Sequence, residues 1–390
     1  MPDLTQALTR RHEQSLYRQR NTVESPQSVH LKIEGRDYLS FCSNDYLGLA
    51  NHPEIVAAYK EGLDRFGVGS GSAHLMTGHS YAHQALEEAL AEFVGQPRTL
   101  LFSTGYMANL GVIDSLVGRS DCVIQDRLNH ASLLDGARLS GAQLLRYRHN
   151  DMDSLRRVLA RRKNCGRRLI ATDAVFSMDG DQADLPALLD TAKRNDSWLL
   201  VDDAHGFGVL GEAGQGSLSQ LGDVDPRVIL MATLGKACGI SGAFVAGSND
   251  LIETLIQSAR TYIYTTATPP AQAWATLTAL RVLKEADEAR LHLGKLVEYF
   301  RVTALTNNLN LYPSTTAIQP LLTGSANQAL ALSERLKSAG LLVSAIRPPT
   351  VPEGEARLRI TFSAKHSFAD VDRLLDTLIQ CGNIPAETVV

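Results

Sequence analysis

The sequence predicts an α/β protein in which a mostly parallel sheet is followed by a small α+β domain. Two observations lead to this prediction. From residue 98 to about 246, short apolar runs alternate with segments of helical spacing, the pattern of a sheet covered by helices on both faces. After about residue 290 the pattern changes to fewer, more widely spaced strands. We expect an N-terminal segment over residues 1–50, a large domain over 51–290 and a small C-terminal domain over 291–390.

The first hundred residues contain elements that precede the sheet. Leu4 to Arg20 has the spacing of an amphipathic helix with a basic face. His30 to Phe41 has the pattern of a short hairpin that turns at Glu34–Gly35. One helix is expected from Pro53, a residue that suits the first helical position, to about Phe66. Another is expected from the N-cap Ser80 to Val94.

Seven short apolar runs are the candidate strands of the large domain. They are Thr99–Phe102, Cys122–Ile124, Gln143–Leu145, Leu169–Ala171, Trp198–Val201, Val228–Met231 and Ala243–Ala246. The helices expected here include Met152–Arg161, Leu185–Arg194 and a long one from about Thr268 into the 290s. The small domain is expected to contain strands at Ala317–Leu322, Leu341–Ile346 and Arg357–Phe362, and helices at Asn327–Ala339 and Phe368–Cys381.

The composition is that of an ordinary globular protein. Of 390 residues 44% are hydrophobic, and the net charge of −4 argues against nucleic acid or an anionic membrane as the main partner. No apolar run is long enough to cross a bilayer. The N-terminus lacks the apolar stretch of a signal peptide, which predicts a cytoplasmic location. The five cysteines are far apart, without a C-x-x-C pair, and are expected to be reduced.

Three patterns suggest other ligands only weakly. The glycine-rich segment Gly67–Ser72 follows a helix instead of a strand, so a flexible substrate-facing loop is expected there in place of a dinucleotide site. His79 and His83 are four residues apart, but no third ligand is evident, and no metal is predicted. The acidic run from Asp173 to Asp181 is interrupted by Met178 and lacks the ligand spacing of a cation loop.

The strongest chemical signal lies at the ends of two buried strands. Asp202, Asp203 and His205 follow one strand, and Lys236 follows the next among glycines and small residues. Open α/β sheets place their ligands at such strand ends. A lysine desolvated in a pocket can form a Schiff base, while a carboxylate can keep a pyridine nitrogen protonated. These are the requirements of pyridoxal phosphate. Strand alternation alone does not decide which aspartate faces the cofactor.

Other strand ends add weaker signals at the same edge. Gly105 and Tyr106 begin a helix directly after a strand, where backbone N–H groups can bind a phosphate. His130 follows the next strand along the chain and could stack on a planar ring, although a capping histidine is the simpler interpretation for this residue alone. Each signal is weak alone, but their common position after successive parallel strands predicts a single site.

Several motifs together resemble those of the α-oxoamine synthase family of fold-type I pyridoxal-phosphate enzymes. They are Ser43–Gly48, Gly105–Tyr106, Asn129–Ser132, Val175–Asp181, Val201–Gly206 and Thr233–Lys236, and they occur in this order over nearly the whole chain. The resemblance implies an aspartate-aminotransferase-like large domain with a seven-stranded, mostly parallel sheet. It also implies condensation of an amino acid with an acyl thioester, with loss of carbon dioxide.

The resemblance assigns roles to individual residues. Lys236 would carry the cofactor and move the α-proton, Asp202 would pair with the ring nitrogen, and His130 would stack on the ring. The other implied cofactor-binding residues are Gly105, Tyr106, Ser177, Ala204, His205 and Thr233. The implied catalytic residues are Lys236, His130, Asp202 and His205. The implied substrate-binding residues are Arg18, Asn44, His130, Arg347, Thr350 and Arg359. Asn44 and Thr265–Thr266 match segments that reach the neighbouring subunit, which implies a homodimer with a shared active site.

The segment Ala345–Pro352 favours one branch of the family. Arg347 stands where glycine-using members tend to have an aromatic residue, and a cation suits an acyl chain that ends in a carboxylate. The expected reaction joins L-alanine to a pimeloyl thioester of coenzyme A or acyl carrier protein, in biotin biosynthesis. The alternatives are a related synthase that uses glycine and another acyl-CoA, a non-catalytic binding protein, and a metal hydrolase. Asp173 and His74 stand where the family more often has glutamate and arginine.

Overall fold

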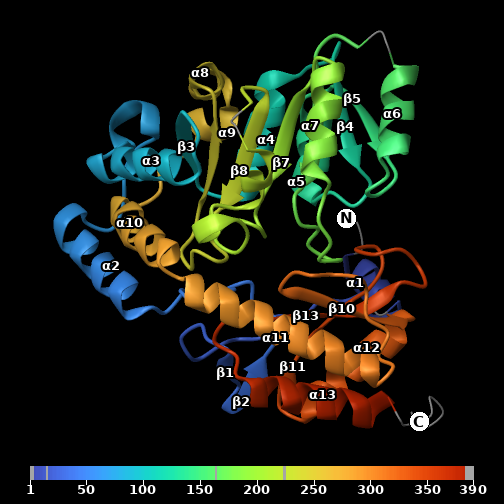
Figure 1. The fold of residues 1–390 in the computed structure, drawn as a ribbon. Helices are drawn as coiled ribbons and strands as arrows, with labels where there is room; N and C mark the ends of the chain where they lie inside the picture. Colours follow the sequence, from blue (N-terminus) through green and yellow to red (C-terminus); the bar gives the residue numbers. More distant parts are fainter. Residues whose placement is uncertain (1–3, 15, 163–164, 223–224, 383–390) are drawn as a thin grey trace. The chain divides into compact units, whose positions relative to one another are not determined.

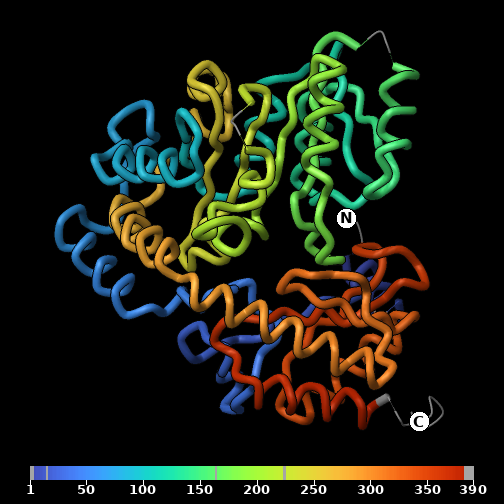
Figure 2. The backbone as a smooth tube through the Cα atoms, in the orientation of Figure 1, coloured from blue at the N-terminus to red at the C-terminus, as the bar shows by residue number. Residues whose placement is uncertain are grey.

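The computed structural model describes residues 4–14, 16–162, 165–222 and 225–382 (Figures 1 and 2). Its contacts divide the chain into two compact units. The first unit comprises residues 1–48, 178–181 and 291–390, and the second comprises 49–177 and 182–290. The N-terminal segment thus belongs to the same unit as the C-terminal hundred residues.

The second unit is built on a seven-stranded sheet with the order β3-β9-β8-β7-β6-β4-β5. Its strands are β3 (Arg98–Phe102), β4 (Cys122–Asp126), β5 (Gln143–Tyr147), β6 (Arg168–Asp173), β7 (Trp198–Asp202), β8 (Val228–Thr233) and β9 (Ala243–Gly247). Only β9 pairs antiparallel with its neighbours, β3 and β8. All seven strands expected from the sequence are confirmed, and so is the mostly parallel sheet.

Helices cover both faces of this sheet (Figure 1). One face packs against α4 (Gly105–Leu116), α5 (Ala131–Leu139) and α8 (Asn249–Ser258), and the other packs against α6 (Met152–Arg161) and α7 (Leu185–Arg194). In β7, Leu200 lies in the first core, while Leu199 and Val201 lie in the second. Burial of successive residues on opposite faces explains why this strand is a continuous apolar run.

The remaining helices of the second unit include several that the sequence indicates. They are α2 (Pro53–Phe66), α3 (Tyr81–Phe93), α9 (Arg260–Ile263), α10 (Pro270–Lys284), a π-helix at His74–Gly78 and 3-10 turns at Glu212–Gly214 and Ser217–Leu221. Ser80 caps α3, as expected, in a capping box with His83. Gly62 lets α2 approach α10, because a Cβ there would lie 2.9 Å from the Ala271 Cα.

The long helix expected from about Thr268 is instead two helices, α10 and α11 (Asp287–Thr306). The side chain of Arg290 accounts for the break. Its guanidinium donates to the carbonyl oxygens of Leu283 at 2.7 Å and Lys284 at 3.3 Å, in the last turn of α10. The carbonyls of the last turn lack the regular i+4 N–H donor of the helix interior, so a cation that binds them stabilises an end at this point.

The first unit contains two three-stranded sheets and four long helices. One sheet has the order β1-β2-β11 and the other β10-β13-β12. The strands are β1 (His30–Ile33), β2 (Arg36–Ser40), β10 (Ile318–Gly324), β11 (Leu341–Leu342), β12 (Ser344–Ile346) and β13 (Ala356–Thr361). The helices are α1 (Leu4–Glu13), α11, α12 (Ala326–Ser338) and α13 (Phe368–Gly382).

Two sequence predictions for this unit need correction. The N-terminal helix ends at Glu13 instead of Arg20, and no residue of it is buried. The rings of His12 and Tyr17 stack with centroids 3.7 Å apart, which folds the chain back after the helix. The strand expected at Leu341–Ile346 is two strands, because β11 pairs with β2 and β12 pairs with β13. The hairpin turn at Glu34–Gly35 is confirmed.

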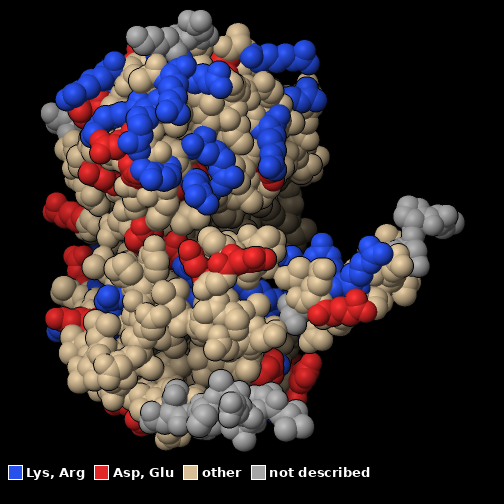
Figure 3. All heavy atoms as spheres, turned by 90° about the vertical axis from the view of Figure 1, so that its right-hand side faces the viewer, with Lys and Arg blue, Asp and Glu red and all other residues tan. Residues whose placement is uncertain are grey.

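Basic side chains gather on the side of the second unit that carries β5 and α6 (Figure 3). We call residues 119–168 the arginine-rich region, since they contain twelve Lys and Arg but only five Asp and no Glu. Its exposed members include Arg127, Arg146, Arg156 and Arg161. In the part of the chain that the structure describes, no helix is long and apolar enough to span a membrane.

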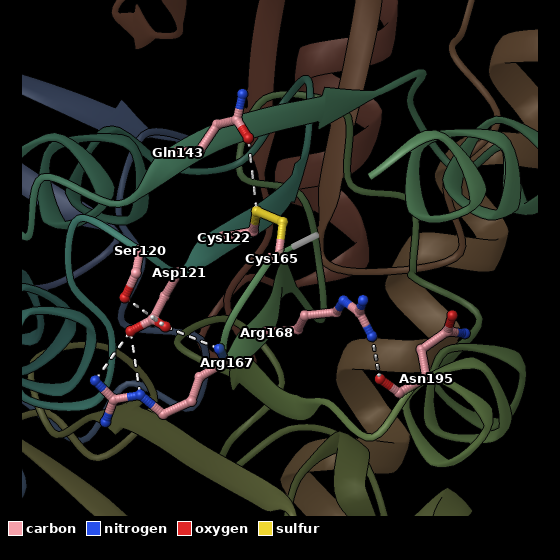
Figure 4. Close-up of a disulfide and its surroundings, with 8 residues drawn as sticks. All are labelled: Ser120, Asp121, Cys122, Gln143, Cys165, Arg167, Arg168 and Asn195. Atoms are coloured by element: carbon pink, nitrogen blue, oxygen red, sulfur yellow. Dashed lines mark hydrogen bonds and ion pairs between the residues drawn. A yellow bond between two sulfur atoms is a disulfide. The ribbon is translucent and has the colours of Figure 1, made fainter. Parts of the chain in front are cut away.

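The expectation that all cysteines are reduced is wrong for one pair, since Cys122 and Cys165 form a disulfide (Figure 4). Cys122 begins β4 and Cys165 lies just before β6, and these strands are parallel neighbours. Their Cα atoms are therefore only 5.9 Å apart despite a separation of 43 residues. Nearby, the Asp121 carboxylate accepts from the Arg167 backbone N–H at 2.8 Å. Cys42, Cys238 and Cys381, all within the described residues, form no disulfide.

Candidate active site

Lys236 and His205 meet at the carboxyl edge of the large sheet. β7 and β8 are parallel neighbours with Asp202 opposite Met231, so the segments that follow them lie side by side. The Lys236 Nζ lies 2.9 Å from the His205 Nε2, and both side chains are half-buried. For the amine to donate, His205 must keep Nε2 unprotonated. An amine held this way is suited to attack an aldehyde.

The two aspartates after β7 have different partners, which decides between them. Asp202 accepts from the Asn109 Nδ2 at 2.8 Å and from the Ala204 backbone N–H at 3.1 Å. Asp203 instead accepts from the backbone N–H and the hydroxyl of Ser217 at 2.7 and 2.6 Å. Burial raises the pKa of Asp203 to about 7. Asp203 therefore anchors a loop, and Asp202 is the candidate carboxylate of the site.

His130 caps α5 and belongs to the same group of side chains. Its Nδ1 lies 2.7 Å from the Ser132 hydroxyl, which in turn lies 2.8 Å from the Asn109 Nδ2. Burial lowers the pKa of His130; the charge of Asp202 acts in the opposite direction, while that of Lys236 lowers the pKa further. The structure thus brings together the residues after β4, β7 and β8.

Asp173, at the end of β6, is hydrogen-bonded to the backbone of His130. Its carboxylate accepts from the His130 backbone N–H at 3.1 Å, and its own N–H donates to the Asn129 Oδ1 at 3.2 Å. Complete burial, followed by the nearby charge of Asp202, raises the pKa of Asp173 well above its usual value. The aspartate that departs from the family pattern is therefore part of the site's frame.

The start of α4 offers backbone donors at the same sheet edge. Thr104 is the N-cap, and its side chain accepts from the Met107 backbone N–H at 3.2 Å. The N–H groups of Gly105 and Tyr106 lie in the first turn, where an α-helix provides no internal acceptors. Such a turn can bind a phosphate.

Tyr106 and Thr233 each stabilise part of this edge. The Tyr106 hydroxyl donates to Asp135, and this bond raises the pKa of the tyrosine. Its ring lies edge-on to His130, with centroids 6.1 Å apart. The Thr233 hydroxyl donates to the Gly242 carbonyl at 3.0 Å, at the start of the loop that carries Lys236.

The other predicted residues of this unit lie on neighbouring segments. Ser177 lies half-buried in the turn after β6, and Ala204 lies half-buried directly after the strand end. The glycine-rich loop pairs with the Thr265–Thr266 segment, since Ala73 forms a β-bridge with Thr266.

In the first unit, Arg359 and Asn44 contact each other. Arg359 on β13 is only 7% exposed and donates to the Asn44 Oδ1 at 3.1 Å and to the Thr361 hydroxyl at 3.0 Å. Arg357, two residues earlier, is buried in ion pairs with Asp179 and Glu355. The two arginines thus have separate tasks, because Arg357 already holds two carboxylates.

Arg347, Thr350 and Arg18 belong to one neighbourhood of the first unit. The Arg347 guanidinium donates to the Tyr17 carbonyl at 2.9 Å, which brings it next to the residue before Arg18. The Thr350 backbone N–H donates to the Arg347 carbonyl at 3.1 Å. Arg18 and Thr350 are exposed, and Arg347 is half-buried.

The expectation of no third histidine beside His79 and His83 is wrong, because His74 joins them. The Nδ1 atoms of His74 and His79 are 3.0 Å apart. However, the His83 Nδ1 accepts from the Ser80 backbone N–H at 3.1 Å, and its Nε2 lies 2.8 Å from the Thr268 carbonyl oxygen. Burial, with the charges of His83 and His79, lowers the pKa of His74 to about 3. His74 and His79 are thus bonded to each other, while both ring nitrogens of His83 already have partners outside the cluster.

Sequence reasoning missed two residues of the site, Asn109 and Ser132. Both are fully buried polar side chains. Asn109 lies one helical turn after Gly105 on an otherwise apolar face of α4, which is a signal that the sequence does contain. A polar residue on such a face requires a partner, but the pattern does not say which one.

The second-unit site has a donor set that fits pyridoxal phosphate. The amine of Lys236 suits its aldehyde, the carboxylate of Asp202 suits its pyridine nitrogen, and the first turn of α4 suits its phosphate. The Asn109 and Ala204 donors hold the Asp202 carboxylate in place.

Comparison with known proteins agrees with this fit. The sequence matches the family Aminotransferase class I and II over residues 36–378. The chain belongs to this family. It is 57% identical over 380 residues to an 8-amino-7-oxononanoate synthase from Pseudomonas putida (strain W619), which covers 97% of both chains. It is 59% identical over 374 residues to one from Nitrosococcus oceani, which covers 96% of this chain and 99% of the relative.

Solved structures of related enzymes have the same fold. A serine palmitoyltransferase from S. paucimobilis with a bound PLP–myriocin aldimine matches with a TM-score of 0.91 at 29% identity, over 98% of this chain and 97% of the other. An 8-amino-7-oxononanoate synthase from Francisella tularensis matches with a TM-score of 0.76 at 31% identity, over 88% and 98%. The aspartate-aminotransferase-like fold expected from the sequence is confirmed.

Proposed function

We propose that this protein condenses L-alanine with a pimeloyl thioester, with loss of carbon dioxide, to form 8-amino-7-oxononanoate in biotin biosynthesis. The observation that carries the proposal is the Lys236–His205 pair beside Asp202 and His130, in a chain similar over its full length to synthases of that name. The enzyme is then a pyridoxal-phosphate-dependent acyltransferase.

The cofactor of this site is pyridoxal phosphate, which supplies an aldehyde and a protonated ring that stabilises negative charge at the substrate α-carbon. Lys236 would hold the cofactor through its amine and would take the α-proton of alanine as a base. Asp202 would pair with the ring nitrogen. His205 orients the amine of Lys236, to which it is hydrogen-bonded at 2.9 Å.

The remaining cofactor contacts follow from the chemistry of each side chain. His130 and Ala204 would lie against the two ring faces, one by stacking and one by apolar contact. Ser177 would lie near the ring hydroxyl of the cofactor, within reach of a hydrogen bond to it. Gly105, Tyr106 and Thr233 would bind on the side of the phosphate, as the open first turn of α4 suits an anion.

Substrate recognition is proposed for the arginines of the first unit. Arg359, oriented by Asn44, would bind the carboxylate of alanine through its planar guanidinium. Arg347, with Arg18 and Thr350 beside it, would bind the acyl donor and its terminal carboxylate. Arg357 is no candidate for either task, because its charge is already balanced by Asp179 and Glu355.

A homodimer with a shared site is proposed from the surface around the glycine-rich loop. Four large apolar side chains are exposed on this loop, the next segment and the segment that pairs with it. They are Val68 (83% exposed), Leu75 (49%), Met76 (77%) and Tyr264 (72%). Large apolar patches of this kind mark surfaces that a partner covers. A cytoplasmic location is proposed together with this function.

The competing reaction uses glycine and a different acyl-CoA. It is less favoured because the relatives at 56–59% identity carry the name 8-amino-7-oxononanoate synthase. A test supplies the purified enzyme with pyridoxal phosphate, L-alanine or glycine, and pimeloyl-CoA or pimeloyl acyl carrier protein. Mass spectrometry should detect 8-amino-7-oxononanoate with alanine. A faster reaction with glycine and another acyl-CoA would overturn the branch assignment, and the two pimeloyl donors identify the carrier.

A further inference from the structure

Asn109 joins two parts of the active site through a single amide group. It lies in α4 with no exposed surface. Its Nδ2 is 2.8 Å from the Asp202 Oδ2 at the end of β7 and 2.8 Å from the Ser132 hydroxyl at the start of α5. The Ser132 hydroxyl is in turn 2.7 Å from the His130 Nδ1. A chain of hydrogen bonds therefore links Asp202 to His130.

The donor and the acceptor of each hydrogen bond between Asp202 and His130 can be assigned. An ionised carboxylate only accepts, so the Asn109 NH₂ group, and not its oxygen, must face Asp202. The second hydrogen of that NH₂ group is donated to Ser132. The Ser132 backbone N–H, which can only donate, points at the His130 Nδ1 at 3.3 Å, so this nitrogen is an acceptor. The Ser132 hydroxyl hydrogen is therefore the one donated to His130.

We propose that Asn109 is a positioning residue that holds Asp202 in place and, through Ser132, fixes His130 in the neutral form with its proton on Nε2. This inference rests on the proposed function for the roles of Asp202 and His130. Its consequence is that His130 presents an N–H donor on the ring nitrogen that Ser132 does not occupy. His130 would then bind a substrate oxygen as a donor and would not act as the base, a task left to Lys236.

Two observations agree with a positioning role. Burial is the main cause that lowers the pKa of His130, so the ring is neutral at neutral pH and its tautomer matters. The Asn109 Oδ1 is buried without a hydrogen-bond partner among the described residues. An unsatisfied buried carbonyl lowers the stability of the fold, and an apolar side chain at this position would avoid that cost. Stability alone therefore does not explain an asparagine at position 109.

The direct test is ¹⁵N NMR of the protein labelled at histidine, with the signal of His130 assigned by its loss in His130→Gln. We expect the proton on Nε2 in the wild type. In Ser132→Ala the fixing donor is lost, and a mixture of tautomers is expected. A wild-type His130 with its proton on Nδ1 would overturn the proposal. This measurement needs neither cofactor nor turnover.

The second test compares Asn109→Leu with a matched control, Gln125→Met. Gln125 is also a fully buried amide, with Nε2 donating to the Leu133 carbonyl at 2.7 Å and an unpartnered Oε1. Asn109→Leu should weaken pyridoxal phosphate binding by about tenfold, since Asp202 loses a donor, and should release the His130 tautomer. Gln125→Met should change neither. Unchanged cofactor affinity and tautomer in a folded Asn109→Leu would contradict the proposal.

The outcomes separate this inference from the proposed function. A wild type that forms 8-amino-7-oxononanoate but shows His130 protonated on Nδ1 would leave the function intact and refute the inference. A wild type that binds no pyridoxal phosphate would refute the function. If Asn109→Leu fails to fold by circular dichroism, the wild-type and Ser132→Ala spectra still decide the tautomer.

Discussion

The Lys236 amine donates to the His205 Nε2 over 2.9 Å, at the edge where two parallel strands end. Because β7 and β8 are adjacent in the sheet, residues separated by a long loop in sequence are held in direct contact. The contact orients the amine, since an imidazole nitrogen that carries no proton can accept its hydrogen bond.

Lys236→Ala should abolish both turnover and covalent attachment of the cofactor. Reduction of the wild type with borohydride fixes a Schiff base as a stable amine, and mass spectrometry should then find one cofactor mass added per chain. The variant should gain none. Lys284→Ala, at the end of α10, serves as the control and should behave as the wild type. An adduct that persists in Lys236→Ala would assign the cofactor to another lysine.

Asp202→Asn should impair catalysis and Asp203→Asn should impair stability, although the two residues are adjacent. Loss of the Asp202 charge should lower kcat by at least about 100-fold, since the ring nitrogen loses its ionic partner, and should weaken cofactor binding about tenfold. Asp203→Asn disturbs only the Ser217 anchor, so kcat should stay within a few-fold while thermal stability falls. Steady-state kinetics and melting curves check both, and the reverse pattern would show that Asp203 serves the cofactor.

Arg359→Ala and Arg347→Ala should raise different Michaelis constants. Loss of a charged, bidentate hydrogen bond should raise the KM for L-alanine about 10- to 100-fold in Arg359→Ala. Arg347→Ala should raise mainly the KM for the pimeloyl donor. Arg357→Met supplies the contrast, since it breaks buried ion pairs and should lower stability. Equal changes in both constants for both variants would refute the division of tasks.

Glu87 should make stability depend on pH. Burial raises its pKa from 4.5 to about 7, and its carboxyl accepts from the Leu101 backbone N–H at 2.9 Å. Between pH 4.5 and about pH 7, the folded state therefore keeps a proton on Glu87 that the unfolded state has released. The stabilisation is complete below pH 4.5 and is lost as the pH rises through 7, at up to about 1.4 kcal/mol per pH unit.

Glu87→Gln should remove this contribution while keeping an acceptor for Leu101. Urea unfolding from pH 5 to pH 8 measures it. The stability of the variant relative to the wild type should rise with pH over this range. A constant difference would mean that Glu87 titrates normally.

The disulfide predicts a definite number of reactive thiols. Alkylation of the unfolded, unreduced protein should modify three of its five cysteines, and all five after reduction. A bridge that closes a 43-residue loop should stabilise the fold by about 3–4 kcal/mol, so Cys122→Ser should lower the unfolding free energy by that order. Alkylation of all five without reduction would show that the purified protein lacks the bond.

The sequence predicts the sheet well because each strand is a short apolar run buried on both faces, as Leu199 and Val201 show on one side and Leu200 on the other. It also predicts the position of Lys236, since parallel strand ends share one edge. The break between α10 and α11 is not predictable in this way, because it depends on a side chain, Arg290, that folds back onto carbonyls.

The details of the site depend on contacts between distant residues, which no local pattern records. Asp202 and Asp203 look equivalent in sequence, and only the positions of Asn109 and Ser217 distinguish them. The Cys122–Cys165 bond depends on the pairing of β4 with β6. His74 completes a histidine cluster through the π-helix between the glycine-rich loop and α3.

The arginine-rich region makes the protein an electric dipole. The chain carries a net charge of −4, while residues 119–168 alone are strongly positive, so the remaining residues are more negative than the total suggests. A polyanion approaching in dilute salt is therefore attracted to the β5–α6 side. Ions screen this field over about 10 Å at 0.1 M salt, so such encounters should be fast at low ionic strength and unselective at high ionic strength.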